Sequence, residues 1–350
     1  MWGKGLMKIN NCKSCGARVE FSPLHQCLKC TNCDTLYPIN ISNQTAKHSI
    51  GWEPDKIKFQ QWLNDNRAYK CGNCGAQVVY DKYDISTMCK YCGTNSLAPF
   101  NDLPGLRPEK IIPFRIAKEQ AEKEFVESTK KRKFLPNKFK NNLRADNMGA
   151  TYLSAFVFDG YVSATYRGVE KITETERTAS GQTRTVTHYR HFSGKIEQQY
   201  NNIIVESNDK ITQSDIADIM PYDCSQSVDY NADFTKGYTV SYYNQQVQDA
   251  EVVAKRQMLR DIESRIRRKY FSIDSLTISP TYSNIVYNYT LLPAYFFEYK
   301  YNKKTYLNVM NGQNGKVAGE VPRSPIKVTL FTIFILLLIG IPVLAIALLM

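Results

Sequence analysis

The chain has 350 residues, of which 43% are hydrophobic and 22% charged, so it is long enough for two or three domains and apolar enough to bury cores. Its formal net charge of +12 favours an anionic partner, either nucleic acid or an anionic lipid surface. The first residues contain no long apolar run, so we expect no secretory signal peptide there. Composition thus excludes a largely disordered chain and predicts folded parts with a basic surface.

Eight of the ten cysteines form two sets with the same internal spacing. Each set reads C-x2-C, then 14 residues, then C-x2-C, and the second set follows the first by 59 positions. This spacing is typical of a zinc ribbon with four thiolate ligands, and the alternative is a disulfide framework or a group of buried thiols. The predicted ligands of two structural zinc ions are Cys12, Cys15, Cys30, Cys33, Cys71, Cys74, Cys89 and Cys92.

The cysteine sets define the first domains. We predict one zinc ribbon over residues 1–38, a second over 69–100, and a linker with a short helix over 39–68. A glycine follows the second cysteine in three of the four pairs, where the turn needs a positive φ. Cys27 is an alternative ligand to Cys30, but the spacing shared with the second set favours Cys30.

Residues 101–145 are predicted to be a linker, a helix and a basic patch. Several prolines mark the linker, and an apolar residue at every fourth position predicts an amphipathic helix over Ala117–Ser128. Seven cations and no acid follow between positions 130 and 144. Such a patch either contacts phosphates of nucleic acid or lipid headgroups, or is a solvated face. Its members are Lys130, Lys131, Arg132, Lys133, Lys138, Lys140 and Arg144.

Residues 146–322 are predicted to form a mixed α+β domain. An aromatic strand is expected from Tyr152 to Phe158, and the longest helix of this domain from Gln245 to Lys269, with Val247, Leu259 and Ile262 on its apolar side. Each of the two longer helices precedes an aromatic strand and a tyrosine-rich hairpin. This repetition suggests two related halves packed as one domain.

The last 23 residues, 328–350, carry no charge and are mostly aliphatic. A helix of that length covers roughly 35 Å, enough to cross the hydrocarbon core, so we expect one transmembrane helix; the alternative is a buried core helix. Arg323 and Lys327 precede it, and the positive-inside rule then places the body in the cytoplasm of a single-pass cell-membrane protein. The predicted fold class is therefore α+β, with two zinc ribbons, a mixed domain and this helix.

Several short stretches between residues 70 and 322 occur in the order found in one group of proteins. Besides the second cysteine set, they are Leu103–Phe114, Lys133–Pro136, Met220–Asp223, Leu292–Phe296 and Val309–Lys316. As a set they resemble bacterial transcription factor IIB-type zinc-ribbon proteins, some of which are labelled relatives of the primosomal replication-restart helicase. The resemblance implies no activity. The chain has no G-x-x-x-x-G-K-[ST] stretch, which argues against ATP-driven unwinding.

The expected function is a non-enzymatic, membrane-anchored scaffold whose two ribbons face the cytoplasm and bind a protein partner. Four-thiolate sites are closed and leave no position for a substrate. The alternative is a membrane-tethered protein that binds nucleic acid through the ribbons and the basic patch. An enzyme is not expected, because no fingerprint of a metalloprotease, a serine hydrolase, a P-loop or a dinucleotide site is present.

Overall fold

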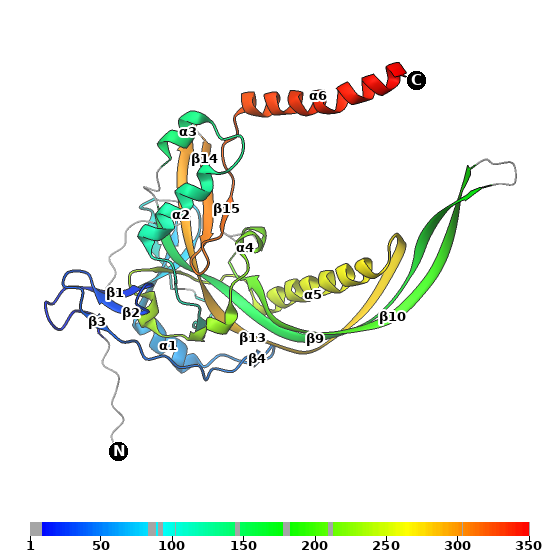
Figure 1. The fold of residues 1–350 in the computed structure, drawn as a ribbon. Coiled ribbons are helices and arrows are strands. Elements are labelled where there is room, and N and C mark those ends of the chain that lie inside the picture. The colour runs from blue at the N-terminus through cyan, green and yellow to red at the C-terminus, as the bar shows by residue number, and fades with distance from the viewer. Residues whose placement is uncertain are drawn as a thin grey trace.

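The computed structural model describes residues 9–82, 89, 94–101, 103–143, 148–177, 183–208, 213–302 and 304–349. A small sheet near the N-terminus and a large mixed sheet make up the β structure, and helices lie on the large sheet (Figure 1). The small sheet contains β1 (Val19–Ser22), β2 (Cys27–Cys30) and β3 (Leu36–Tyr37).

Over the described residues the large sheet has 12 strands, with β11-β8-β13-β9-β12-β6-β5-β7 as its main order. Off this path, β10 pairs with β9, β4 with β13, and β14 with both β13 and β15. Its strands are β4 (His48–Ser49), β5 (Asn66–Cys71), β6 (Gln77–Asp81), β7 (Leu97–Pro99), β8 (Lys110–Ile111), β9 (Met148–Arg177), β10 (Thr183–Glu206), β11 (Val228–Asp229), β12 (Thr239–Ser241), β13 (Ile273–Tyr301), β14 (Lys304–Asn311) and β15 (Val317–Gly319).

Two helices lie close to where the apolar periodicity predicts them. The predicted helix over Ala117–Ser128 is α2 (Lys118–Lys130), and the predicted longest helix of the mixed domain is α5 (Val247–Lys269). The remaining helices are α1 (Lys56–Asn64), α3 (Asn137–Asn142), α4 (Gln213–Ile219), α6 (Pro325–Leu349) and the 3-10 turns η1 (Cys224–Gln226) and η2 (Ala232–Thr235).

The same order of elements occurs twice along the chain. β8, α2, β9 and β10 are followed by β12, α5, β13 and β14. The short strand of each group pairs in parallel with the long strand of the other, β8 with β13 and β12 with β9, while the long strands pair with each other antiparallel. The two groups of elements are therefore joined reciprocally within one sheet.

The two long strands are buried on both faces where they cross the body. On β9, Tyr152 and Phe156 face one apolar cluster, whereas Leu153, Ala155 and Val157 face another. The first cluster is aromatic: the ring of Phe114 lies 4.4 Å from that of Tyr238 and 4.9 Å from those of Tyr152 and Tyr295. Alternation along β9 and β13 therefore builds a core on each side of the sheet.

Beyond the body, β9, β10 and β13 curve away as a long arm, and α5 lies against one side of it (Figure 1). Met258, Ile262 and Ile266 of α5 are buried in one cluster with side chains of the arm. Register shifts at 200–203 of β10 and 283–286 of β13 both lie opposite residues 158–161 of β9. Such bulges bend and twist a sheet, which accounts for the curvature.

The C-terminal helix α6 projects from the body near α3 (Figure 1), and Phe134 contacts its Phe331 with ring centres 5.1 Å apart. The side chains that the structure describes in this helix end at Ile339. Among the described residues no helix is long and apolar enough to cross a membrane, since a crossing needs about 20 consecutive apolar residues. On this finding, the predicted transmembrane helix at 328–350 and the cell-membrane, cytoplasm-facing placement that rested on it are wrong.

Candidate metal centres

The first cysteine cluster contains all four predicted ligands of the first set. The sulfur atoms of Cys12, Cys15, Cys30 and Cys33 lie within 4.8 Å of one another. Three of the sulfur pairs are separated by 3.4, 3.5 and 3.5 Å. A tetrahedral site with metal–sulfur bonds near 2.3 Å would separate its sulfurs by roughly 3.8 Å. The four thiols therefore fit one tetrahedral metal ion.

Two tight turns bring these sulfur atoms together. In the first turn, the Gly16 amide donates to the Cys12 carbonyl and the Cys12 amide to the Ala17 carbonyl. Gly16 has φ +77°, which a residue without a side chain adopts at little cost. The second turn places Asp34 at φ +57° in the equivalent position. Backbone amides of Ser14 and Asn32 point at ligand sulfurs from 3.4 Å, and such donors stabilise a thiolate.

Hydrogen bonds and neighbouring thiols shift the pKa values of Cys12 and Cys15 in opposite directions. A hydrogen bond from the Tyr37 hydroxyl, 3.2 Å from the Cys12 sulfur, outweighs burial and lowers the pKa of Cys12 to about 5. For Cys15, the Ala17 amide lowers the pKa, but contacts with the thiols of Cys33 and Cys30 and desolvation together raise it to about 11. Four adjacent thiolates repel one another, so a bound divalent cation would supply the charge that lets all of them ionise.

The second cluster contains Cys71, Cys74 and Cys89, whose sulfur atoms also lie within 4.8 Å of one another. Cys92, the fourth predicted ligand, lies outside the described residues. The Cys71 turn repeats the hydrogen bonds of the first turn: the Gly75 amide donates to the Cys71 carbonyl, and the Cys71 amide to the Ala76 carbonyl. The sulfurs of Cys74 and Cys89 are 3.7 Å apart. This cluster too can hold a metal ion.

The second ribbon is part of the large sheet rather than a separate module. Its β6 pairs antiparallel with β12, with Val79 opposite Val240. Cys71, Ala76 and Cys89 belong to the same buried cluster as the inner residues of β9 and β13. The cysteine spacing predicted a zinc ribbon over 69–100 but not its pairing with β12, because spacing indicates candidate ligands and not the strand that pairs with the ribbon.

The first ribbon keeps its own sheet and rests on the body at one side. Phe21 packs edge-to-face on Phe234 at 5.2 Å, and the Gln26 side chain donates to the Phe114 carbonyl at 2.8 Å. The metal-binding turns point away from this contact, since Cys15 and Cys33 are exposed. Two large apolar side chains on this ribbon, Leu24 and Leu36, are 77% and 47% exposed.

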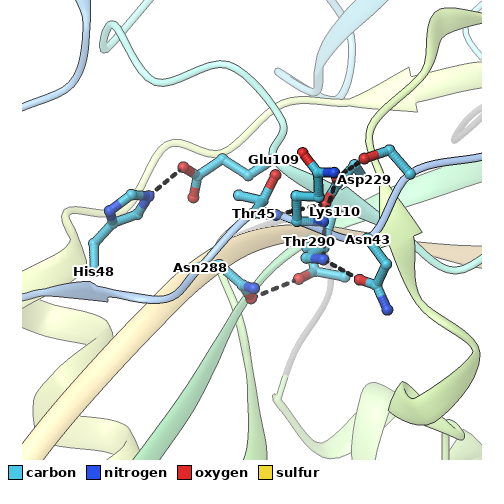
Figure 2. A network of polar contacts seen from close by, with 10 residues as sticks. Asn43, Thr45, His48, Glu109, Lys110, Asp229, Asn288 and Thr290 are labelled. Carbon is cyan, nitrogen blue, oxygen red and sulfur yellow. Dashed lines mark hydrogen bonds and ion pairs between the residues drawn. The ribbon is translucent and has the colours of Figure 1, made fainter.

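The linker after the first ribbon is held to the body by a polar network (Figure 2). His48 contacts Glu109 at 2.6 Å and stacks on Trp52 at 3.6 Å. The ammonium of Lys110 lies 2.8 Å from Asp229 and also donates to Asn43. Both cation and carboxylate are largely buried, with 7% and 17% of their side chains exposed.

Asp229 joins the linker to the body through several hydrogen bonds at once. Its carboxylate accepts from the Ser42 hydroxyl at 2.6 Å and from the amides of Gln44 and Thr45 at 2.7 and 3.0 Å. Burial by itself would raise the pKa of Asp229, but these bonds and the one from Lys110 outweigh it and hold the pKa well below its usual range. No pattern in the sequence predicts this network, because its members are ordinary polar residues far apart in the chain.

The predicted basic patch lies on the end of α2, the following loop and α3. Lys131, Lys133 and Lys140 are exposed, whereas Arg132 donates to the backbone carbonyls of Gly319 and Val317. Arg144 lies outside the described residues. The patch therefore contributes exposed cations, but Arg132 fixes β15 to the α2–α3 loop.

Comparison with known proteins gives one relative of uncharacterized function. The chain is 26% identical over 315 residues to the uncharacterized protein YdjG of Bacillus subtilis, an alignment that covers 75% of this chain and 92% of that protein. No family model and no solved structure matches the chain.

Proposed function

We propose that the protein is a non-enzymatic zinc-ribbon scaffold that holds two structural zinc ions and binds a protein partner through its first ribbon. Sets of four thiolates around one ion are the usual composition of structural zinc sites, and they leave no open position for a substrate. The two ions would have different tasks. The second would stabilise the large sheet, and the first would shape a surface for the partner.

The observation that carries the proposal is the asymmetry of the first ribbon. One of its sides is fixed to the body through Phe21 and Gln26, while the metal-binding turns and the side chains of Leu24 and Leu36 stay exposed. Apolar side chains on a rigid, exposed surface lose little conformational entropy on binding. A docked ribbon of this kind presents a preformed contact surface.

The test is a comparison of bound proteins after proximity labelling with the full-length chain. Leu24→Ser combined with Leu36→Ser should remove specific partners without releasing zinc. A matched control is Leu307→Ser, because Leu307 is 42% exposed on β14, away from the ribbon. An unchanged set of partners in the double variant, with zinc content intact, would remove the first ribbon as the binding surface.

A second candidate function is binding to nucleic acid, and the exposed lysines of the basic patch favour it. Contacts with phosphates release counterions, so affinity should fall steeply as salt rises. Lys131→Ala, Lys133→Ala and Lys140→Ala together should weaken binding and flatten this salt dependence, measured by fluorescence anisotropy with a labelled oligonucleotide. Lys300→Ala serves as the control, because Lys300 is an exposed lysine on β13. Absence of any complex at low salt would exclude this candidate.

A further inference from the structure

A hollow of about 650 Å³ opens on the body and is lined by residues that belong to neither cysteine set. Three segments line it: the loop after α4, the turn between β14 and β15, and Arg115 in the connection from β8 to α2. Two of the stretches singled out by sequence, Met220–Asp223 and Val309–Lys316, meet here. The zinc-scaffold function gives these stretches no role.

The walls of the hollow are held in place by hydrogen bonds between these segments. The side-chain amide of Gln313 accepts from the Asp223 amide at 2.7 Å and donates to the Asp223 carbonyl at 3.2 Å. Asn314 donates to the Pro221 carbonyl at 2.7 Å, and the hydroxyl of the buried Tyr222 donates to the Pro293 carbonyl at 3.0 Å. The site is therefore preformed, which lowers the cost of binding a ligand.

The acceptor atoms of the side chains around the hollow already have partners. The two oxygens of Asp223 accept from Ser225 and Gln226, and the Gln226 oxygen accepts from Arg115 Nε at 3.1 Å. The Asn314 oxygen accepts from the Lys316 amide at 3.0 Å.

These oxygens keep further lone pairs, and many donors around the hollow are also unused. Each primary amide has a second N–H, and the Nη groups of Arg115 carry four more. Within the described residues, Arg115 forms a hydrogen bond to the neutral amide of Gln226 and no ion pair with a carboxylate. Spare donors beside the exposed Arg115 guanidinium, which has no ion-pair partner among the described residues, suit a ligand that accepts hydrogen bonds and carries negative charge.

We propose that this hollow binds a carboxylate, with Arg115 as its cationic partner. Arginine pairs with a carboxylate through two parallel hydrogen bonds, which fixes orientation as well as charge. Phosphate is disfavoured because the Asp223 carboxylate lines the same hollow and repels a dianion. Hydrogen bonds from the Ser225 hydroxyl and amide and from Gln226 lower the pKa of Asp223, so its charge persists at neutral pH. The carboxylate belongs either to a small acid or to the C-terminus of a peptide.

The test uses the full-length protein and isothermal titration with four probes. They are acetyl-trialanine with a free C-terminus, the same peptide as its C-terminal amide, propionate and inorganic phosphate. We expect the free acid to bind and its amide not to bind. Tighter binding of the peptide than of propionate would identify a chain terminus as the source, and equal binding would identify a small acid.

Arg115→Gln should weaken the binding of the free acid at least about tenfold, as expected when a charge-assisted pair is lost. The matched control is Arg167→Gln, because Arg167 is an exposed arginine on β9 of the arm. Zinc content and circular dichroism of both variants should equal those of the wild type, which separates this site from the zinc-scaffold function. The proposal is overturned if no probe binds, if acid and amide bind alike, if phosphate binds more tightly than the acid, or if Arg115→Gln binds like the wild type.

Discussion

Replacement of Asp229 by asparagine tests whether the polar network fastens the linker to the body. The substitution keeps the size of the side chain and removes its charge. Lys110 would then keep a positive charge with only 7% of its side chain exposed. The amides of Gln44 and Thr45 would lose their anionic acceptor as well.

The expected loss of unfolding free energy can be estimated from the distance between Lys110 and Asp229. Two unit charges 2.8 Å apart attract by about 6 kcal/mol at an effective dielectric constant near 20. Desolvation of both groups offsets part of this attraction, and breaking a buried pair typically costs about 3–5 kcal/mol. Because Asp229 is partly exposed, we expect Asp229→Asn to lower the free energy of unfolding by about 3 kcal/mol, at the lower end of that range.

Urea unfolding followed by tryptophan fluorescence measures this loss, since Trp52 stacks on His48 of the linker. Lys110→Met and the double variant complete a mutant cycle, in which the double variant should be more stable than the two single losses predict. Hydrogen exchange should also accelerate at 42–45. A loss below about 0.5 kcal/mol, the range of ordinary surface substitutions, would refute the reasoning.

The sign of the pH dependence follows from the lowered pKa of Asp229. The pair contributes its stability above the ordinary aspartate pKa of about 3.9, and that stability is lost as the pH falls further towards the folded-state pKa. Asp229→Asn should therefore remove part of the acid sensitivity of the wild type. Equal acid sensitivity in both proteins would contradict this account.

Two further predictions concern the metal centres and the docking of the first ribbon. Cys33→Ser and Cys71→Ser should each reduce bound zinc from two ions to one, as measured by metal analysis. Only Cys71→Ser should strongly lower the stability of the whole body, because its ribbon shares the large sheet. Equal effects of the two substitutions on urea unfolding would contradict this difference between the ribbons. Phe21→Ala should lower the free energy of unfolding by about 3 kcal/mol and raise hydrogen exchange in the first ribbon and in η2. Leu24→Ala is the control, because Leu24 is exposed on the same ribbon. Unchanged exchange at η2 would show that the ring contact does not hold the ribbon on the body.

Sequence alone predicted the cysteines that the structure gathers into two clusters, Cys92 lying outside the described residues, and it predicted the two amphipathic helices α2 and α5. Cysteine spacing and apolar periodicity are local signals. The buried side of α5 illustrates the limit. The apolar pattern placed Val247, Leu259 and Ile262 on it. Ile262 is buried, but Val247 and Leu259 are only half-buried. The buried residues repeat every four positions from Ala250 through Met258 to Ile266. This helix has apolar residues on several sides, and its packing against the curved arm determines which of them are buried.

Longer-range features had no local signal. The pairing of β6 with β12 and the meeting of Asp229 with residues 42–45 join segments more than 150 positions apart. The apolar C-terminal segment gave the opposite error, since hydropathy alone predicted a membrane span that the described part of the chain does not show. Composition identifies an apolar helix but not whether lipid, protein or water surrounds it.

The continuity of β9 has a mechanical consequence. This strand runs without a break from Arg177, at the end of the arm, to Met148 in the body. It pairs with β10 from Arg177 to Ala155 and with β13 from Glu170 to Met148. A force applied along the arm would load those ladders in shear, where many backbone hydrogen bonds share the strain. The force would thus be transmitted to the sheet that carries the second cysteine cluster without first extending a flexible loop.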